Sequence, residues 1–188
     1  MTNDSEIERL ISVIIERYRT SFAEKIYSEE NNDHDVIMDM FSITPIIKRE
    51  NRQYWGRELG MCWQLIVSAV CKARCSDYKP AQRFGADEPC DLIVGKYAID
   101  TKYRIGSGDS GTLKKFKQYG PLLRGEDLKP VLLIVRPDNL AAAITACLSG
   151  GWDVYHSDRS FKFIQEITGF DLHSLLKSMS GKFPVERK

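Results

Sequence analysis

The sequence contains no long apolar run: nothing in its 188 residues approaches the ~20 consecutive apolar residues that a membrane-spanning helix needs. Its first ten residues, MTNDSEIERL, lack the basic and apolar regions of a signal peptide. Internal repeats and low-complexity linkers are absent as well. The composition, 43% apolar and 28% charged, is typical of an ordinary globular domain. We therefore expect a soluble protein of the cytoplasm with no membrane partner.

Paired cysteines are also missing. The five cysteines are an odd number without a CxxC pair, and the three histidines do not cluster with them. The spacing therefore gives no indication of a zinc site, and we expect small apolar thiols in a reducing compartment. The formal net charge of +1 predicts no partner by itself, so only local charge patterning can indicate one.

Hydrophobic periodicity predicts one domain, residues 1–188, made of three parts. Residues 1–53 form an N-terminal helical extension, and its amphipathic helix over 5–30 is a candidate dimer face. Residues 54–136 form the core, and residues 137–188 complete the sheet with a strand and helices.

The element order favours the α/β class, of the α+β type, with a central mixed β-sheet flanked by helices. The helices expected after residue 53 lie over 54–73, 112–123, 139–151, 160–169 and 171–179. The expected strands lie over 82–84, 91–94, 97–105, 130–135 and 152–156, the fourth of them buried on both faces.

The segment CDLIVGKYAIDTKYR, residues 90–104, reads as a β-hairpin. Gly95-Lys96 suits a type II′ turn, which pairs Val94 with Tyr97 and sets Asp91 opposite Asp100. Side chains alternate along a strand, so Asp91, Asp100 and Lys102 share one face. The opposite face, expected to be the core side, carries Leu92, Val94, Tyr97, Ile99 and Thr101.

Two carboxylates on facing strands repel and destabilise a sheet unless something compensates. A hard cation such as Mg²⁺ does so through oxygen ligands, and Lys102 beside it would hold a phosphate or a water. Of the four acid-x-Lys triplets in the chain, the Asp100 triplet is the one that closes an apolar strand beside a second aspartate. The alternative is a solvated sheet edge on which these charges do no chemistry.

A glycine loop and a basic helix follow the hairpin. Gly106, Gly108 and Gly111 spell GxGxxG, but the preceding strand carries charges and the helix is interrupted at Gly120-Pro121, so a dinucleotide site is disfavoured. Such a loop also lets backbone N–H groups approach phosphates, and the lysines would neutralise a DNA backbone. The alternative is a solvated lysine face. The candidate DNA contacts are Arg104, Ser107, Lys114, Lys115, Lys117, Gln118 and Tyr119.

The stretch PCDLIVGKYAIDTKYR resembles the active-site hairpin of the PD-(D/E)XK nuclease superfamily, over roughly residues 54–135. The resemblance implies a restriction-endonuclease-like core in which Asp91, Asp100 and the Thr101 carbonyl bind the metal. It also implies that Lys102 positions the attacking water and that Glu58, in WGRELG, binds or orients a second metal. One departure is Cys90, which separates Pro89 from Asp91 where the family motif has them adjacent.

The resemblance implies a Mg²⁺-dependent endodeoxyribonuclease acting on double-stranded DNA, of the type II restriction endonuclease kind, working as a homodimer. Three alternatives remain open. A structure-selective resolvase or repair nuclease would share the metal site, a non-catalytic DNA-binding module would bind without cutting, and a nucleotide-binding protein would use the glycine loop.

Overall fold

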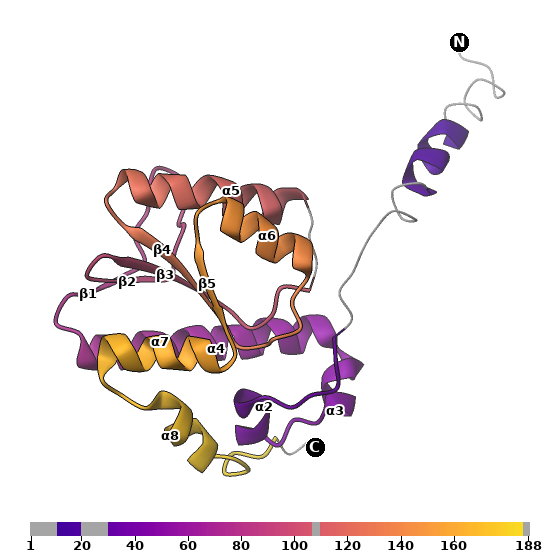
Figure 1. The fold of residues 1–188 in the computed structure, drawn as a ribbon. Helices are drawn as coiled ribbons and strands as arrows, with labels where there is room; N and C mark the ends of the chain where they lie inside the picture. Colours follow the sequence, from indigo (N-terminus) through magenta and orange to yellow (C-terminus); the bar gives the residue numbers. More distant parts are fainter. Residues whose placement is uncertain (1–10, 20–29, 107–109, 186–188) are drawn as a thin grey trace.

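The computed structural model describes residues 11–19, 30–106 and 110–185 (Figure 1). Its centre is a five-stranded sheet with the order β1-β2-β3-β4-β5. The first three strands pair antiparallel and the last three pair parallel. This mixed sheet, flanked by helices, confirms the expected α/β class. The strands are β1 (Tyr78–Pro80), β2 (Leu92–Val94), β3 (Tyr97–Lys102), β4 (Lys129–Ile134) and β5 (Asp153–His156).

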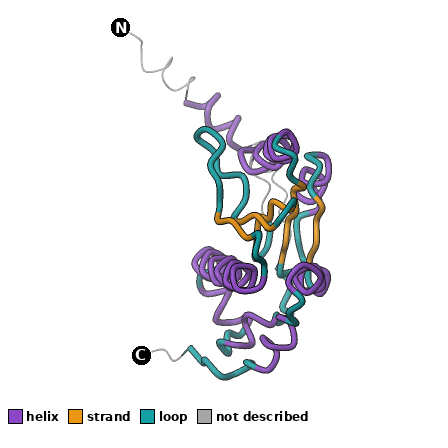
Figure 2. Tube along the Cα trace, turned by 90° about the vertical axis from the view of Figure 1, so that its left-hand side faces the viewer, coloured by secondary structure: helices purple, strands orange, loops and turns teal. Residues whose placement is uncertain are grey.

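Helices cover both faces of the sheet (Figures 1 and 2). Helix α5 (Ser110–Gly125) joins β3 to β4, and α6 (Ala141–Ser149) joins β4 to β5. Because the strand order follows the chain, both crossovers run in the same direction and their helices share one face. Helices α4 (Arg52–Arg74) and α7 (Asp158–Thr168) cover the opposite face.

Three shorter helices pack against α4 and α7, namely α2 (Val36–Met40), α3 (Pro45–Glu50) and α8 (Leu172–Ser178). The first two were not predicted from the sequence. Each begins at a side-chain cap: Asp35 accepts hydrogen bonds from the N–H groups of Ile37 and Met38, and Thr44 accepts one from Ile47. No helix among the described residues is long and apolar enough to cross a membrane.

The core consists of two apolar layers, one on each face of the sheet. Trp63 of α4 is fully buried in one layer and donates its indole N–H to the Leu133 carbonyl at 3.2 Å. Phe116 of α5 and Trp152 pack edge to face in the other. Strand β4 is buried from Pro130 to Ile134, which confirms that it is covered on both faces.

Two sequence expectations are wrong. A strand over 82–84 does not form: β1 lies earlier, and its three residues already pair with all three residues of β2, so the later segment has no partner there. Helix α5 is not interrupted at Gly120-Pro121 but continues to Gly125. A Cβ on Gly120 would lie 1.8 Å from the Gly150 carbonyl oxygen, so this helix approaches α6 more closely than any side chain allows.

Candidate active site

The predicted hairpin forms, and the predicted register holds from the turn to the pair of Leu92 with Ile99. Val94 pairs with Tyr97 and Leu92 with Ile99, and Gly95 at the turn has φ 52°, which a type II′ turn requires at its first position. Asp91, one residue before β2, comes alongside Asp100, and its N–H donates to the Ile99 carbonyl at 2.8 Å. The hairpin thus brings the two carboxylates to the same end of neighbouring strands.

From Leu92 to Val94 and from Tyr97 to Ile99 the side chains alternate as predicted, but both faces are core. Asp91 departs from the predicted alternation, because it accepts the hydroxyl of Thr101, the residue expected on the opposite face. Leu92 and Ile99 lie in the layer under α4, whereas Ile93 and Ala98 lie in the layer under α5 and α6. The expectation of one core face and one open face is therefore wrong. Asp100 is only 9% exposed, because helices cover the face that it shares with Ala98.

Thr101 fixes the carboxylate of Asp91. Its backbone N–H donates to Asp91 Oδ2 at 2.7 Å, and its hydroxyl donates to the same oxygen at 2.6 Å. Hydrogen bonds to a charged acceptor are among the strong ones in proteins. Asp91 is therefore held by the strand that carries the second carboxylate.

Lys102 binds Asp100 and the neighbouring backbone. Its ammonium lies 2.8 Å from Oδ1 and 2.7 Å from Oδ2 of Asp100, and it donates to the Thr101 carbonyl at 3.1 Å. The protein itself therefore compensates the two facing carboxylates, Asp100 through this ammonium and Asp91 through Thr101.

Burial raises the pKa of Asp100 to about 6, and the nearby negative charge of Asp91 adds to the rise, while Lys102 opposes it. Burial alone would lower the pKa of Lys102, but the charges of Asp100 and Asp91 outweigh it and raise that pKa. Asp100 and Lys102 therefore each favour the charged form of the other.

The oxygens around Lys102 fit a hard divalent cation. Mg²⁺ in proteins binds carboxylate and carbonyl oxygens, and Asp100 and Thr101 already present both kinds to a cationic group. Asp91 adds a second carboxylate. Across residues 11–19, 30–106 and 110–185, no three histidine, cysteine, aspartate or glutamate side chains gather as a metal-binding group. A cation here would therefore take its remaining ligands from carbonyl, water or phosphate oxygens.

Glu58 is not brought to the pair. It lies on α4, which packs against the other face of the sheet, and its side chain is 45% exposed. Its carboxylate pairs with the adjacent Arg57 at 2.8 Å. The family resemblance predicts that Glu58 binds or orients a second metal. Its exposed position and its pairing with Arg57 do not support that role.

Of the seven candidate DNA contacts, four are exposed on one helix and a fifth is buried. Lys114, Lys115, Lys117 and Gln118 are exposed on α5, as a basic contact surface requires. Arg104 is instead largely buried: its guanidinium donates to the Asp138 carbonyl at 2.9 Å and lies 3.2 Å from the Asp138 carboxylate. This pairing places Arg104 in the protein interior rather than on a contact surface.

The two remaining candidates differ from these. The Tyr119 hydroxyl donates to Asp87 Oδ1 at 2.8 Å, which ties α5 to the connection between β1 and β2. Ser107 lies outside the described residues.

A buried charged network, which the sequence analysis did not find, lies beyond the carboxyl end of β4. Arg136 is 1% exposed, and its guanidinium contacts Asp138 at 2.9 Å and Asp35 at 3.3 Å. It also donates to the Asp33 carbonyl at 2.5 Å. The available signal was VRPDN, an arginine and an aspartate that directly follow a buried apolar strand.

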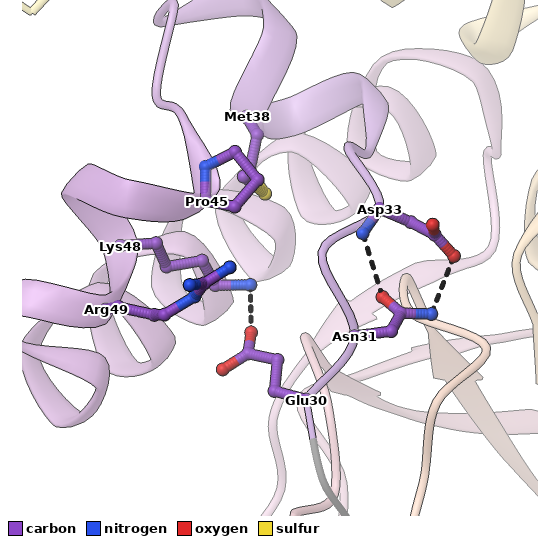
Figure 3. A pocket seen from close by; sticks show the side chains of 7 residues that line it. All are labelled: Glu30, Asn31, Asp33, Met38, Pro45, Lys48 and Arg49. Atoms are coloured by element: carbon purple, nitrogen blue, oxygen red, sulfur yellow. Dashed lines mark hydrogen bonds and ion pairs between the residues drawn. The ribbon is translucent and has the colours of Figure 1, made fainter.

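The network continues to the end of β3. The Tyr103 hydroxyl donates to Asp35 and accepts from the Lys48 ammonium at 2.8 Å. Lys48 in turn pairs with Glu30, and Figure 3 shows these two side chains facing one another across a small pocket. The segment before α4 is therefore bonded to the same strand that carries Asp100 and Lys102.

The five cysteines do not pair with one another. All five are free thiols; Cys71, Cys90 and Cys147 are buried, and burial raises the pKa of each of these three to about 12. Such thiols are protonated at neutral pH and are poor metal ligands and nucleophiles.

Comparisons with protein-family models, with curated proteins and with solved structures find no match to this chain.

Proposed function

We propose that this protein is a Mg²⁺-dependent endodeoxyribonuclease that hydrolyses phosphodiester bonds of double-stranded DNA, and that it is a type II restriction endonuclease of the cytoplasm. One observation carries the proposal: Lys102 contacts Asp100, while Asp91 is fixed beside them from the neighbouring strand. This arrangement of two acids and a lysine is what the family resemblance requires at its catalytic hairpin.

When bound, Mg²⁺ would supply a Lewis acid for the phosphodiester and lower the pKa of a water molecule. Asp91 and Asp100, with the Thr101 carbonyl, would hold it. Thr101 keeps Asp91 in place through two hydrogen bonds. Lys102 would move from Asp100 to the attacking water or to a phosphate oxygen, where its charge stabilises the negative charge that develops.

Duplex DNA would approach along the exposed side of α5. Lys114, Lys115 and Lys117 are exposed there and lie on the helix that follows the catalytic strand. Lysines near phosphates release counterions and give sequence-independent affinity that falls with salt. We expect a homodimer, because one catalytic centre serves one strand of a symmetric site.

The proposal is tested by incubating the protein with plasmid DNA and Mg²⁺. The natural protein should give discrete fragments, and Asp91→Ala, Asp100→Ala and Lys102→Ala should each abolish them. The control is Asp153→Ala. Asp153 lies on β5, outside the site, and its carboxylate pairs with Lys129 of β4. This variant should cut as the natural protein does.

Each alternative predicts a different result. Cleavage confined to junctions or flaps would favour a resolvase or repair nuclease, and DNA binding without Mg²⁺-dependent cutting would favour a binding module. Saturable binding of NAD or ATP, without cutting, would favour the nucleotide-binding alternative. Cutting that persists in Asp100→Ala would show that the site is wrongly assigned.

A further inference from the structure

A tight turn lies in the connection between β1 and β2. The N–H of Phe84 donates to the Asp87 carbonyl at 2.8 Å, and the N–H of Asp87 donates back to the Phe84 carbonyl at 3.2 Å. Gly85, between them, has φ 66°, a conformation that residues with a Cβ rarely adopt. The chain therefore reverses here through a short hairpin-like turn.

The turn is fastened to the body of the protein at three points. The Phe84 ring packs against the apolar layer under α5 and α6. The Asp87 carboxylate accepts the Tyr119 hydroxyl of α5 at 2.8 Å. After the turn, Pro89 and Cys90 are buried. These contacts fix the backbone of the turn and of the residues next to it against α5.

Gln82 and Arg83 lie directly before this turn, and both are exposed. The Arg83 side chain is 81% exposed, and its guanidinium lies 3.7 Å from the exposed carboxylate of Glu88, too far for a hydrogen bond. Arg104 and Arg136 differ, because their guanidinium groups bond to Asp138 in the interior. Arg83 is thus an exposed arginine next to the anchored turn, and its ion-pair partner is the exposed Glu88.

The turn stands beside the candidate active site and the basic helix. It leads through Pro89 and Cys90 directly into Asp91. Its anchor, Tyr119, lies one helical turn after the exposed Lys115 on the same side of α5. A duplex whose backbone meets these lysines would therefore have the turn next to it.

We infer that the segment leading into this turn reads bases in the major groove, with Arg83 bonding a guanine of the recognition site and Gln82 beside it. The inference rests on the proposed function and names its specificity element. An arginine fork bonds guanine O6 and N7 together, and a glutamine does the same at adenine. A lysine carries the same charge but cannot form the paired bonds.

The test compares Arg83→Lys and Arg83→Ala with the natural protein. The recognition sequence is first obtained by sequencing the ends of fragments cut from plasmid DNA. Binding is then measured for the duplex that contains this site and for duplexes in which one G·C pair at a time is replaced. The control is Arg159→Ala, an exposed arginine of α7 on the opposite side of the sheet.

Both Arg83 variants should lose about tenfold or more of the discrimination at one G·C position, while Arg83→Lys keeps its affinity for unrelated DNA. Arg159→Ala should discriminate as the natural protein does. If Arg83→Lys keeps full discrimination at every position, or if both variants only weaken binding equally to all sequences, Arg83 contacts phosphate and the inference is wrong. A natural protein that neither cuts nor binds DNA would instead overturn the proposed function.

Discussion

Thr101 donates two hydrogen bonds to one oxygen of Asp91, from its backbone N–H at 2.7 Å and from its hydroxyl at 2.6 Å. The same residue presents its carbonyl to Lys102. One residue of β3 therefore connects the first carboxylate of the site with its ammonium group. The backbone bond survives any substitution except proline, whereas the hydroxyl can be removed alone.

Replacing Thr101 by valine should lower DNA cleavage about ten- to a hundredfold, as expected when a group that orients a metal ligand is lost. The side chain keeps its shape, so the unfolding free energy should fall by only about 1–3 kcal/mol. Plasmid cleavage and urea unfolding measure the two effects. Thr101→Ser restores the hydroxyl and should recover most of the activity. Full activity in the valine variant would show that the hydroxyl does not position Asp91.

Replacing Lys102 by methionine should separate metal binding from catalysis. The ammonium bonds both oxygens of Asp100 and the Thr101 carbonyl, so it competes with a cation for these ligands. The variant should bind Mg²⁺ severalfold more tightly in calorimetric titration without DNA, and it should not cut. Lys129→Met, which removes a lysine paired with Asp153, serves as the control and should leave the affinity for the metal unchanged. Weaker metal binding in Lys102→Met would contradict this account.

The hairpin could be predicted from the sequence because its determinants are local. Gly95-Lys96 sets the turn, and the turn sets the register from Val94–Tyr97 to Leu92–Ile99. Asp91 follows directly and bonds to the Ile99 carbonyl, next to Asp100. The covering of both faces could not be predicted in this way. Whether Asp100 faces water or a helix depends on where α5 and α6 lie, and no pattern within the hairpin encodes that.

Long-range pairs account for most of what was missed. Arg136 contacts Asp35 across 101 residues of sequence, and Arg104 contacts Asp138 across 34. An arginine next to a lysine-rich helix looks like a DNA contact until its distant carboxylate is known. The strand expected over 82–84 does not form for a related reason: its residues suit a strand, but β1 already occupies all three pairing positions on that side of β2.

Asp138, a member of the Arg136 network, makes the free energy of unfolding depend on pH in the acid range. Burial alone would raise the pKa of Asp138, but hydrogen bonds from Arg136 and from the Asn31 backbone outweigh it and lower that pKa. A lowered pKa in the folded state means that the ionised form stabilises the protein. This contribution is complete above the pKa of an unfolded aspartate, about 3.9, and it is lost as the pH falls through the lower pKa of the folded state.

Asp138→Asn should therefore lower the unfolding free energy at pH 7 by on the order of 2–4 kcal/mol, since it breaks a buried ion pair. Urea unfolding between pH 3 and pH 7 should show the difference from the natural protein shrinking below about pH 4. Asp153→Asn, in a half-exposed pair with Lys129, should cost less than about 1 kcal/mol. A deficit in Asp138→Asn that does not change with pH would rule out the ionised carboxylate as its cause.

The helical residues 11–19 bear on the expected homodimer. Ile11, Ile14, Ile15 and Tyr18 follow the spacing of one helix face, and each is at least 50% exposed. An apolar face of this kind is stable in water only when another surface covers it, and a second copy of the chain would do so. Val13 is 62% exposed but lies on the other side of the helix.

Ile14→Glu should therefore convert the dimer to monomers and reduce cleavage of both strands, whereas Val13→Glu should do neither. The two variants add the same charge at similarly exposed positions one residue apart, so a general effect of charge or helix propensity would appear in both. Sedimentation of the free protein and of its DNA complex gives the mass in each case. A natural protein that sediments as one subunit on DNA would remove the dimer from the proposal, and dimers that persist in Ile14→Glu would place the interface elsewhere on the molecule.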